Sequence, residues 1–409
     1  MSEEKNIPKH WQVKKLGEVC TYSKGKMPQV LVEEKNNECA IPYINIKAFE
    51  KGIFAEYTNG VKCNLCEEND LLMVWDGARC GLIGKAKKGA VGSTLMKILP
   101  KENIHKEYLY HFISSKFWTL NTKPRGVGIP HIEPTLLWNF ELAVPPLPEQ
   151  QAIVSKIEEL LSELENGKQQ LQTAQQQLKV YRQSLLKWAF EGKLTNKNVN
   201  GELPKHWEVK KLGEICVTTS GGTPSRGNKK YYEGNIPWVK SGELDKGLIL
   251  DTEETISEEA IKNSSAKIFP KGTLLIALYG ATIGKLAFLG VNAATNQAIC
   301  GIFKSEKINS NYLFHFLFYK KPSLVKQSIG GAQPNISQGI LKNLEIPLPP
   351  LKEQQRIVAE LESKLTVCDK IEETISQSLQ QAETLKQSIL KKAFEGKLVT
   401  QNHKNKNGK

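Results

Sequence analysis

The sequence predicts an α+β protein in which two mixed domains alternate with two long helices, and three observations lead to this prediction. An internal repeat is present, because PKHWQVKKLGEVC at 8–20 returns as PKHWEVKKLGEIC at 204–216. Each half opens with short apolar runs broken by glycine and proline, which are typical of strands and turns. Each half closes with a heptad pattern, which predicts a helix with a coiled-coil seam. The repeat also predicts internal pseudo-twofold symmetry.

The repeat continues in the same order along the chain. Its further blocks are IPYI at 41–44 and IPWV at 236–239, YLYHF at 108–112 and YLFHF at 312–316, and PPLPEQQ at 145–151 and PPLKEQQ at 349–355. By contrast, the stretches 21–40 and 217–235 barely match. The ends of each half are therefore expected to serve a shared role, and the middles to differ in theirs.

The closing segment of each half is predicted to be a long helix, 147–195 in the first half and 351–400 in the second. Pro148 and Glu149 suit a helix N-terminus, and Gly192 suits its end. The predicted seam consists of Ile153, Ile157, Leu160, Leu164, Leu171, Leu178, Leu185, Ile357, Leu361, Cys368, Ile371, Ile375, Leu385 and Ile389. Such a helix needs a partner, and the second copy is the nearest candidate. Two alternatives stay open: separate packing on each domain, or a hairpin at Asn166-Gly167.

Composition narrows the function classes. Lys and Arg number 56 against 43 Asp and Glu, a formal charge of +13 that favours a polyanionic partner, with an inert basic surface as the alternative. No apolar run is long enough to span a membrane, and the start is too polar for a signal peptide, so we expect a cytoplasmic protein. The eight cysteines are then expected to be reduced. A zinc site at Cys63 and Cys66, completed by Cys39 and Cys80, is a weaker alternative.

No pattern in the sequence predicts catalysis by this chain. GATIGK at 280–285 has three residues between its glycines and lacks the Ser or Thr of a phosphate-binding loop, so we interpret it as a turn between strands. His111 and His315 occur within helical apolar patterns and are interpreted as structural. Metal, nucleophile-elbow and dinucleotide motifs are absent.

The divergent middles carry basic and amide side chains of the kinds that contact phosphates and base edges. The segment 220–230 is predicted to be a flexible loop that supplies several of them. The candidate DNA-binding residues are Lys24, Lys26, Arg79, Lys87, Lys88, Arg125 and His131 in the first half, and Ser220, Thr223, Ser225, Arg226, Asn228, Lys229, Lys240, Asn296, Gln297, Gln333 and Asn335 in the second. Each one has a solvated basic or polar loop as its alternative.

The two divergent domains are accompanied by the motifs IPW, SGGTPS and GATIGK and by the repeated EQQ and AFEGKL blocks. In these features the chain resembles the specificity (S) subunit of type I restriction-modification systems. The resemblance extends over essentially the whole chain. It implies two target recognition domains, at 1–146 and 205–350. The polar stretch 196–204, which contains Gly201, is interpreted as the linker between the two halves, and 401–409 as a polar tail. The resemblance also implies that the two helices form an antiparallel coiled coil.

The resemblance further implies a function and partners. Each recognition domain would read one half of a bipartite double-stranded DNA target, and the coiled coil would set the spacer. The chain itself would bind no cofactor or metal. It would dock two modification (methyltransferase) subunits that use S-adenosylmethionine and two restriction (endonuclease and translocase) subunits that use ATP and Mg, away from any membrane. The alternatives are a specificity subunit of a related system outside type I, a fused enzyme, and a basic coiled-coil scaffold without sequence preference.

Overall fold

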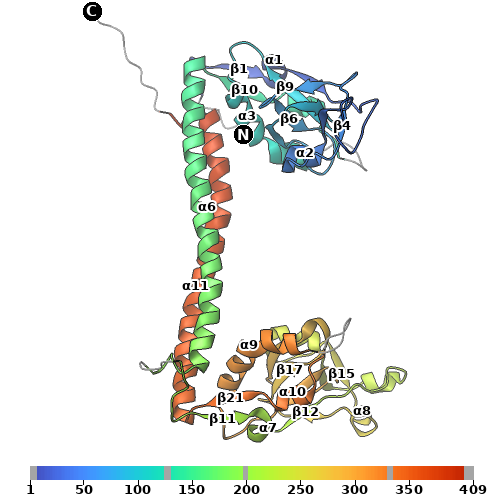
Figure 1. Cartoon of the computed structure of the whole chain (residues 1–409), viewed down its shortest axis with the longest axis vertical. Helices are drawn as coiled ribbons and strands as arrows, with labels where there is room; N and C mark the ends of the chain where they lie inside the picture. The colour runs from blue at the N-terminus through green and yellow to red at the C-terminus, as the bar shows by residue number, and fades with distance from the viewer. Residues whose placement is uncertain (1–6, 124–129, 197–200, 329–334, 400–409) are drawn as a thin grey trace, which may run out of the picture. The chain divides into compact units, whose positions relative to one another are not determined.

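The computed structural model describes residues 7–123, 130–196, 201–328 and 335–399. The chain forms two compact units, one of Met1–Gln172 with Ser376–Lys409 and one of Thr173–Ile375. Each unit contains one mixed domain, part of helix α6 (Leu147–Phe190) and part of helix α11 (Leu351–Phe394) (Figure 1). Both helices have 44 residues, and α6 passes through Gly167 unbroken. The alternative of a hairpin at this glycine is therefore excluded.

The first domain is built from short strands and short helices. Its strands are β1 (Gln12–Lys15), β2 (Cys20–Lys24), β3 (Ile41–Ile44), β4 (Tyr57–Thr58), β5 (Leu65–Cys66), β6 (Leu71–Val74), β7 (Ile83–Lys85), β8 (Gly89–Val91), β9 (Leu95–Pro100) and β10 (Glu141–Val144). Its helices are α1 (Leu16–Val19), α2 (Ile46–Lys51), α3 (Lys106–Ser115), α4 (Phe117–Thr122) and α5 (Pro134–Trp138).

The second domain repeats this plan with some additions. Its strands are β11 (Glu208–Lys211), β12 (Thr218–Ser220), β13 (Ile236–Val239), β14 (Leu248–Ile249), β15 (Glu254–Ile256), β16 (Ile268–Phe269), β17 (Leu274–Ala277), β18 (Leu286–Leu289), β19 (Ala293–Thr295), β20 (Ile299–Ile302) and β21 (Glu345–Leu348). Its helices are α7 (Leu212–Ile215), α8 (Glu258–Lys262), α9 (Ser310–Gln327) and α10 (Gln338–Lys342), with 3₁₀ turns η1 (Lys229–Tyr232), η2 (Ser241–Lys246) and η3 (Gly280–Thr282).

The sheets of the two domains correspond. The first domain has an antiparallel sheet in the order β2-β9-β6-β7, a mixed sheet β4-β3-β8-β5 and the pair β1-β10. The second has β12-β20-β17-β18-β14, β15-β13-β19-β16 and the pair β11-β21. One pair is parallel in each four-stranded sheet β4-β3-β8-β5 and β15-β13-β19-β16, β3 with β8 and β13 with β19, and the second domain adds the parallel pair β14 with β18. The repeat is therefore a repeat of topology as well as of sequence.

Strand β6 of the sheet β2-β9-β6-β7 and strand β17 of the sheet β12-β20-β17-β18-β14 are apolar throughout, because both faces of each strand are buried. In β6, Leu71 and Met73 enter the core shared with α3, while Leu72 and Val74 enter the core of the mixed sheet. This alternation follows from the two-residue period of a strand. Strand β17 divides its four residues between two cores in the same way.

The glycine-rich segment at 280–285 connects β17 to β18, which pair antiparallel. Gly280 and Gly284 have positive φ angles of 61° and 74°, which glycine adopts without the strain of a Cβ atom. The interpretation of this segment as a turn between strands is confirmed.

The repeated EQQ block joins each long helix to its domain. Gln150 is fully buried, accepts a hydrogen bond from the backbone of His105 at 2.8 Å, and donates to the carbonyls of Asn103 and Pro145 at 2.9 and 2.8 Å. Gln354 is equally buried and bonds the backbone of Asn309 and the carbonyl of Pro349 at 2.7 and 2.8 Å. The repeated motif is thus a buried polar link that fixes where the helix leaves the domain.

The repeated opening block packs against the end of a helix. Gly396 has a φ of 71°, and a Cβ there would lie 2.6 Å from the ring of Pro8 and 3.4 Å from Trp11. In the other unit, Gly192 has a φ of 79°, and a Cβ there would lie 2.6 Å from the ring of Pro204 and 3.6 Å from Trp207. Both tryptophans are 7% exposed and belong to the hydrophobic cores of their units. The repeated block that ends each long helix, AFEGKL, therefore packs against a repeated opening block, PKHW, and the two form one junction in each unit.

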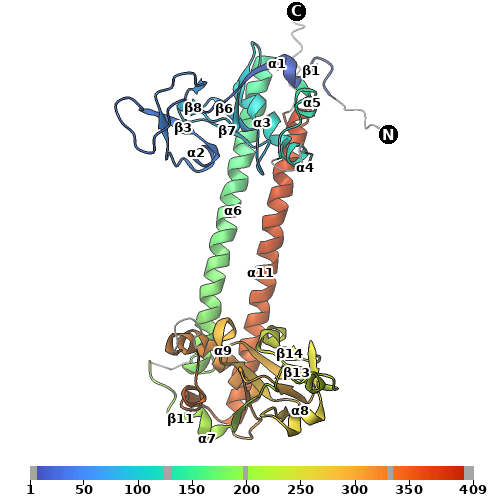
Figure 2. The same ribbon diagram turned by 90° about the vertical axis from the view of Figure 1, so that its right-hand side faces the viewer.

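Within each unit, α6 and α11 run antiparallel beside one another (Figure 2). In the first unit Lys168 Nζ lies 2.7 Å from Glu383 Oε1. In the second unit Arg182 bonds Asp369 and Glu372 at 2.7 and 3.0 Å. Charged pairs of this kind between helices fix register and orientation. The helices therefore pair with one another in each unit, and the alternative of separate packing is excluded.

Most of the predicted seam is buried or half-buried, but two assignments are wrong. Ile371 is 43% exposed, so α6 does not cover it. Leu385 is 51% exposed and is likewise left uncovered. Ile153, Ile157, Leu178, Leu185, Ile357, Leu361, Cys368, Ile375 and Ile389 are buried, and Leu160, Leu164 and Leu171 are half-buried.

Candidate nucleic-acid interface

A charged cluster occupies one end of the antiparallel sheet in the first domain, and we call it the first edge: Lys24, Asp76 and His131. Lys24 is the last residue of β2, Asp76 follows β6, and His131 pairs with Asp76 in an isolated antiparallel bridge. Asp76 Oδ2 lies 3.0 Å from Lys24 Nζ, and Asp76 Oδ1 lies 2.6 Å from His131 Nδ1. One carboxylate therefore holds two candidate DNA-binding side chains that are distant in sequence.

The backbone beside the first edge is closely packed. Gly25 donates to the carbonyl of Leu95 at 2.9 Å, and Lys26 donates to that of Val91 at 3.2 Å. A Cβ at Gly25 would lie 2.0 Å from the carbonyl oxygen of Gly92, so no other residue fits without movement of the backbone. The chain thus leaves β2 along a fixed path, with the side chain of Lys26 exposed beside it.

The second edge, which we define as Ser220, Tyr279 and Asn335, occupies the corresponding place in the second domain. Ser220 ends β12, and Tyr279 and Asn335 form the corresponding isolated antiparallel bridge. Ser220 Oγ accepts a hydrogen bond of 2.5 Å from Gln338 Nε2. Nearby, the hydroxyl of Thr223 bonds the side-chain oxygen of Gln297. This edge presents neutral hydroxyl and amide groups where the first edge presents charges.

The backbone path at the second edge matches that at the first. Gly221 donates to the carbonyl of Ile299 at 3.0 Å, and Gly222 donates to that of Thr295 at 2.9 Å. A Cβ at Gly221 would lie 2.3 Å from the Thr295 carbonyl oxygen. The prediction that 220–230 is a flexible loop is therefore wrong at these glycines, which are held by backbone hydrogen bonds in a close crossing.

Arg226 and Lys240 form a charged cluster beside the second edge. The guanidinium of Arg226 lies 4.2 Å from the ring centre of Tyr232 and 5.1 Å from that of Trp238. It also bonds Glu254 at 2.6 Å, which raises the pKa of Arg226 and lowers that of Glu254. Lys240 bonds the same carboxylate at 3.1 Å and Glu253 at 2.6 Å. Both cations are therefore fixed in orientation by acidic partners.

Other candidates lie elsewhere. Lys87 and Lys88 pair with Glu68 and Glu67 at 2.7 and 2.9 Å, beside the start of β6, whereas Asp76 follows its end. The structure therefore does not bring these two lysines to the first edge. Arg79 lies on the turn after β6 and is 3.7 Å from Glu50.

The remaining candidates have simple placements. Asn296 donates its backbone amide to the carbonyl of Val239 at 3.0 Å, close to the second edge. Asn228 is the N-cap residue of η1. Lys229, which follows it, and Ser225 are both exposed. Arg125 and Gln333 lie outside the described residues.

The sequence analysis missed Asp76, Tyr279 and Gln338. Asp76 and Tyr279 carry a carboxylate and a phenol, which are not among the basic and amide groups expected to contact DNA, whereas Gln338 is an amide that its sequence position did not distinguish. A signal was nonetheless present, because Asp76 and Tyr279 each precede a glycine of the matched turn, Gly77 and Gly280. The repeat thus indicated two corresponding positions that carry different chemistry.

The histidines and cysteines considered above have structural surroundings. Burial lowers the pKa of His111 to about 4 and also lowers that of His315. Burial raises the pKa of the Cys66 thiol to about 11, and its Sγ donates to the carbonyls of Lys87 and Gly89. Across the described ranges, no three or more His, Cys, Asp or Glu side chains come together as metal ligands would.

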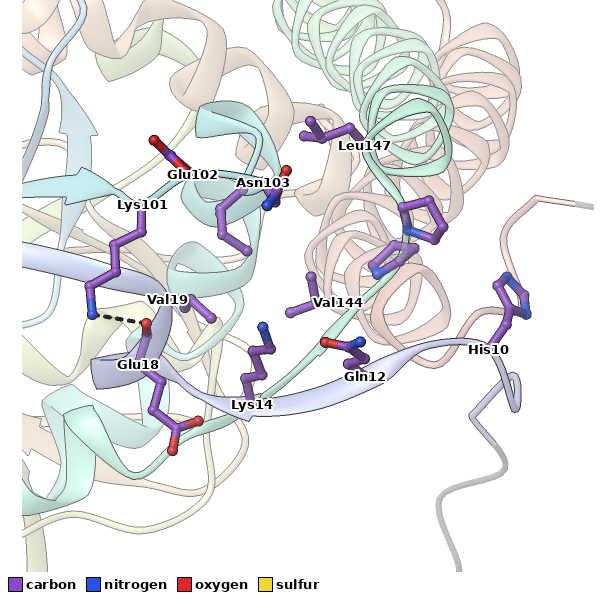
Figure 3. A pocket seen from close by; sticks show the side chains of 13 residues that line it. His10, Gln12, Lys14, Glu18, Val19, Lys101, Glu102, Asn103, Val144 and Leu147 are labelled. Carbon is purple, nitrogen blue, oxygen red and sulfur yellow. Dashed lines mark hydrogen bonds between the residues drawn. The ribbon is translucent and has the colours of Figure 1, made fainter.

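A hollow of about 940 Å³ lies at the opposite end of β2 from the first edge (Figure 3). Its lining includes His10 and Lys14 from the opening block, Lys101, and Leu147 at the start of α6. Lys101 Nζ donates to the carbonyl of Glu18 at 3.0 Å. The hollow therefore belongs to the junction with α6 and not to the edge.

Among the helices in the described part of the chain, none combines the length and apolar character needed to cross a lipid bilayer.

The comparisons with known proteins agree with this architecture. The model of the type I restriction modification DNA specificity domain matches residues 8–173 and again 204–381. The MjaVIII specificity subunit of Methanocaldococcus jannaschii is 30% identical, over 97% of this chain and 95% of its own. The EcoKI specificity subunit of Escherichia coli is 27% identical over 97% and 90%.

Solved structures share the fold. A chain from a type I R-M system, solved to explain complex assembly and conformational transition, matches with a TM-score of 0.74 and 22% identity over 96% of this chain and 99% of its own. The HsdS subunit from Thermoanaerobacter tengcongensis matches with a TM-score of 0.62 and 20% identity over 96% and 98%. With both halves matched by one domain model and a relative aligned along almost its whole length, the chain belongs to the family of type I restriction-modification DNA specificity subunits.

Proposed function

We propose that this chain is the non-catalytic DNA-recognition subunit of a type I complex, in which each domain reads one half of a bipartite target. One observation carries the proposal: the two domains hold different polar side chains on corresponding backbone. Lys24, Asp76 and His131 in the first domain correspond to Ser220, Tyr279 and Asn335 in the second. Two edges with the same frame and different donors and acceptors are suited to two different half-sites.

The overall charge supports DNA as the ligand. The whole chain has a formal charge of +13, which attracts a polyanion. The edges supply hydrogen-bonding groups that distinguish bases. Charge alone gives affinity without sequence preference. The proposal therefore assigns affinity to the basic surface and specificity to the edges.

The two helices are proposed to set the spacer and to dock the partners. A 44-residue helix has a length of about 66 Å. The ion pairs at Lys168 and Arg182 fix the register of α6 against α11. We place methylation with S-adenosylmethionine in two modification subunits, and cleavage with ATP and Mg in two restriction subunits.

The proposal is tested by selecting bound sequences from randomised duplex DNA. The chain is co-expressed with its modification subunit, and binding is performed at physiological salt because affinity for DNA depends steeply on salt. We expect two short blocks separated by an unspecified spacer. One continuous block would contradict two readers, and binding without enrichment would support a scaffold that lacks sequence preference.

A further inference from the structure

We propose that the two edges select different bases: the first contacts a guanine through Lys24, held in place by Asp76, and the second contacts an adenine through Asn335. This inference rests on the proposed function, because it assumes that both edges meet DNA. It assigns Asp76 the role of a positioning residue.

The ion cluster at the first edge is arranged to present Lys24. The side chain of Asp76 is only 15% exposed, whereas that of Lys24 is 47% exposed. The carboxylate is held from a second side by His131 at 2.6 Å, so its position is fixed independently of Lys24. A free lysine has many rotamers, and this anchor reduces their number before DNA arrives.

The groups that remain at Lys24 match guanine. An ammonium has three N–H donors, and Asp76 takes one of them. The major-groove edge of guanine offers two acceptors, O6 and N7, and lysine is one of the side chains that bond both. A carboxylate beside the ammonium would repel a phosphate. The cluster therefore favours a base edge over the DNA backbone.

The second edge has the chemistry that suits adenine. The side chains at the three corresponding positions, Ser220, Tyr279 and Asn335, are uncharged. Asn335 is exposed, and its place is fixed because the next residue, Ile336, donates to the carbonyl of Leu278 at 2.9 Å. The asparagine amide carries one donor group and one acceptor, which match N7 and N6 of adenine.

The test repeats the DNA selection with the same co-expressed complex and with variants of each edge. Asp76→Asn removes the anchoring charge at nearly constant shape, and Lys24→Ser installs the residue of the second edge. Asn335→Ala removes the second reader. The control is Lys87→Ser, because Lys87 is also ion-paired, 2.7 Å from Glu68, but lies beside the start of β6.

We expect the wild-type complex to select a guanine in one half-site and an adenine in the other. Asp76→Asn and Lys24→Ser should each lower the preference for that guanine about tenfold and leave the other half unchanged. Asn335→Ala should relax one adenine in the opposite half only. Lys87→Ser should leave both halves unchanged and weaken binding to all sequences alike.

Two results would overturn the inference separately from the proposed function. One is a bipartite motif without these bases, and the other is a motif that the edge variants do not alter. Since Lys24 is exposed, its substitution does not disturb the core, so an unchanged motif in Lys24→Ser is decisive even if Asp76→Asn fails to fold. A wild-type selection without a bipartite motif would instead overturn the proposed function, and this inference with it.

Discussion

The two domains are most alike at their junctions with the long helices and least alike at their edges. At the junctions, Gln150 and Gln354 make the same kind of buried link to a backbone amide and a proline carbonyl. At the edges, a carboxylate between two basic groups in one domain is replaced by a phenol, a hydroxyl and an amide in the other. The same backbone frame can therefore carry different polar side chains in the two domains. Variants of the frame, the junctions and the long helix, together with acid, test how far the two domains behave alike.

The largest effect is expected where the shared frame itself is disturbed. Gly25→Ala and Gly221→Ala place a Cβ 2.0 Å from the Gly92 carbonyl oxygen and 2.3 Å from the Thr295 carbonyl oxygen. Because these contacts are with backbone, each variant should lose about 3 kcal/mol of unfolding free energy in its own unit. Hydrogen exchange of the two units measures this loss. Losses of equal size would show that both units depend on the same close crossing of backbone, whereas a variant without any loss in its own unit would contradict the shared frame.

A smaller effect is expected at the junctions. Gln150→Ala leaves the amide of His105 and two carbonyls without their partner, and should cost about 2 kcal/mol. Gln354→Ala should cost somewhat less, because fewer hydrogen bonds are lost. Denaturant unfolding measures both. Gln151→Ala is the matched control, because Gln151 is exposed, and a cost equal to that of Gln150→Ala would contradict the buried link.

Acid should weaken the first unit through His111. Burial lowers its pKa from 6.5 to about 4, so between these values the unfolded chain binds a proton that the folded chain does not. Stability should therefore fall as pH decreases through this window, by roughly 1.5 kcal/mol between pH 7 and pH 5. Unfolding measured as a function of pH tests this.

The variant His111→Phe supplies the control for acid sensitivity, because it removes the titrating group from the same buried site. Its unfolding free energy should vary less with pH between 7 and 5 than that of the unchanged chain. An identical slope in the two proteins would show that His111 is not the source.

The smallest effect is a gain in the coiled coil. Gly167 lies within α6, and a Cβ there meets nothing within 4 Å. Gly167→Ala should therefore stabilise the helix by up to about 1 kcal/mol, because alanine has the higher helix propensity and loses less backbone entropy. Thermal unfolding checks the gain, and destabilisation would show that a side chain is not tolerated at that position.

Much of the fold could be predicted from sequence because it depends on periodic patterns. The heptads predicted both helices, and the repeat predicted two corresponding domains. The seam prediction was wrong at Ile371 and Leu385, which are 43% and 51% exposed. The heptad pattern of one helix does not show which residues of the other helix lie opposite, so it could not predict the exposure of these two side chains.

The edges were predictable only in part, because they assemble from distant segments. Lys24 and His131 were predicted as separate DNA contacts, but only the fold shows that Asp76 joins them. Lys87 and Lys88 have equally suitable chemistry, yet the antiparallel course of β6 and β7 carries them away from this edge. Residue type indicated the class of contact, while strand register decided which residues meet.

The most direct test of two readers on a common spacer is the DNA selection repeated with both helices shortened. Removing 170–176 from α6 and 375–381 from α11 keeps the heptad phase and both the Lys168–Glu383 and Arg182–Asp369 pairs, and shortens the helix pair by about 10 Å. We expect two unchanged half-sites separated by a spacer about three base pairs shorter. An unchanged spacer, or altered half-sites, would contradict this expectation.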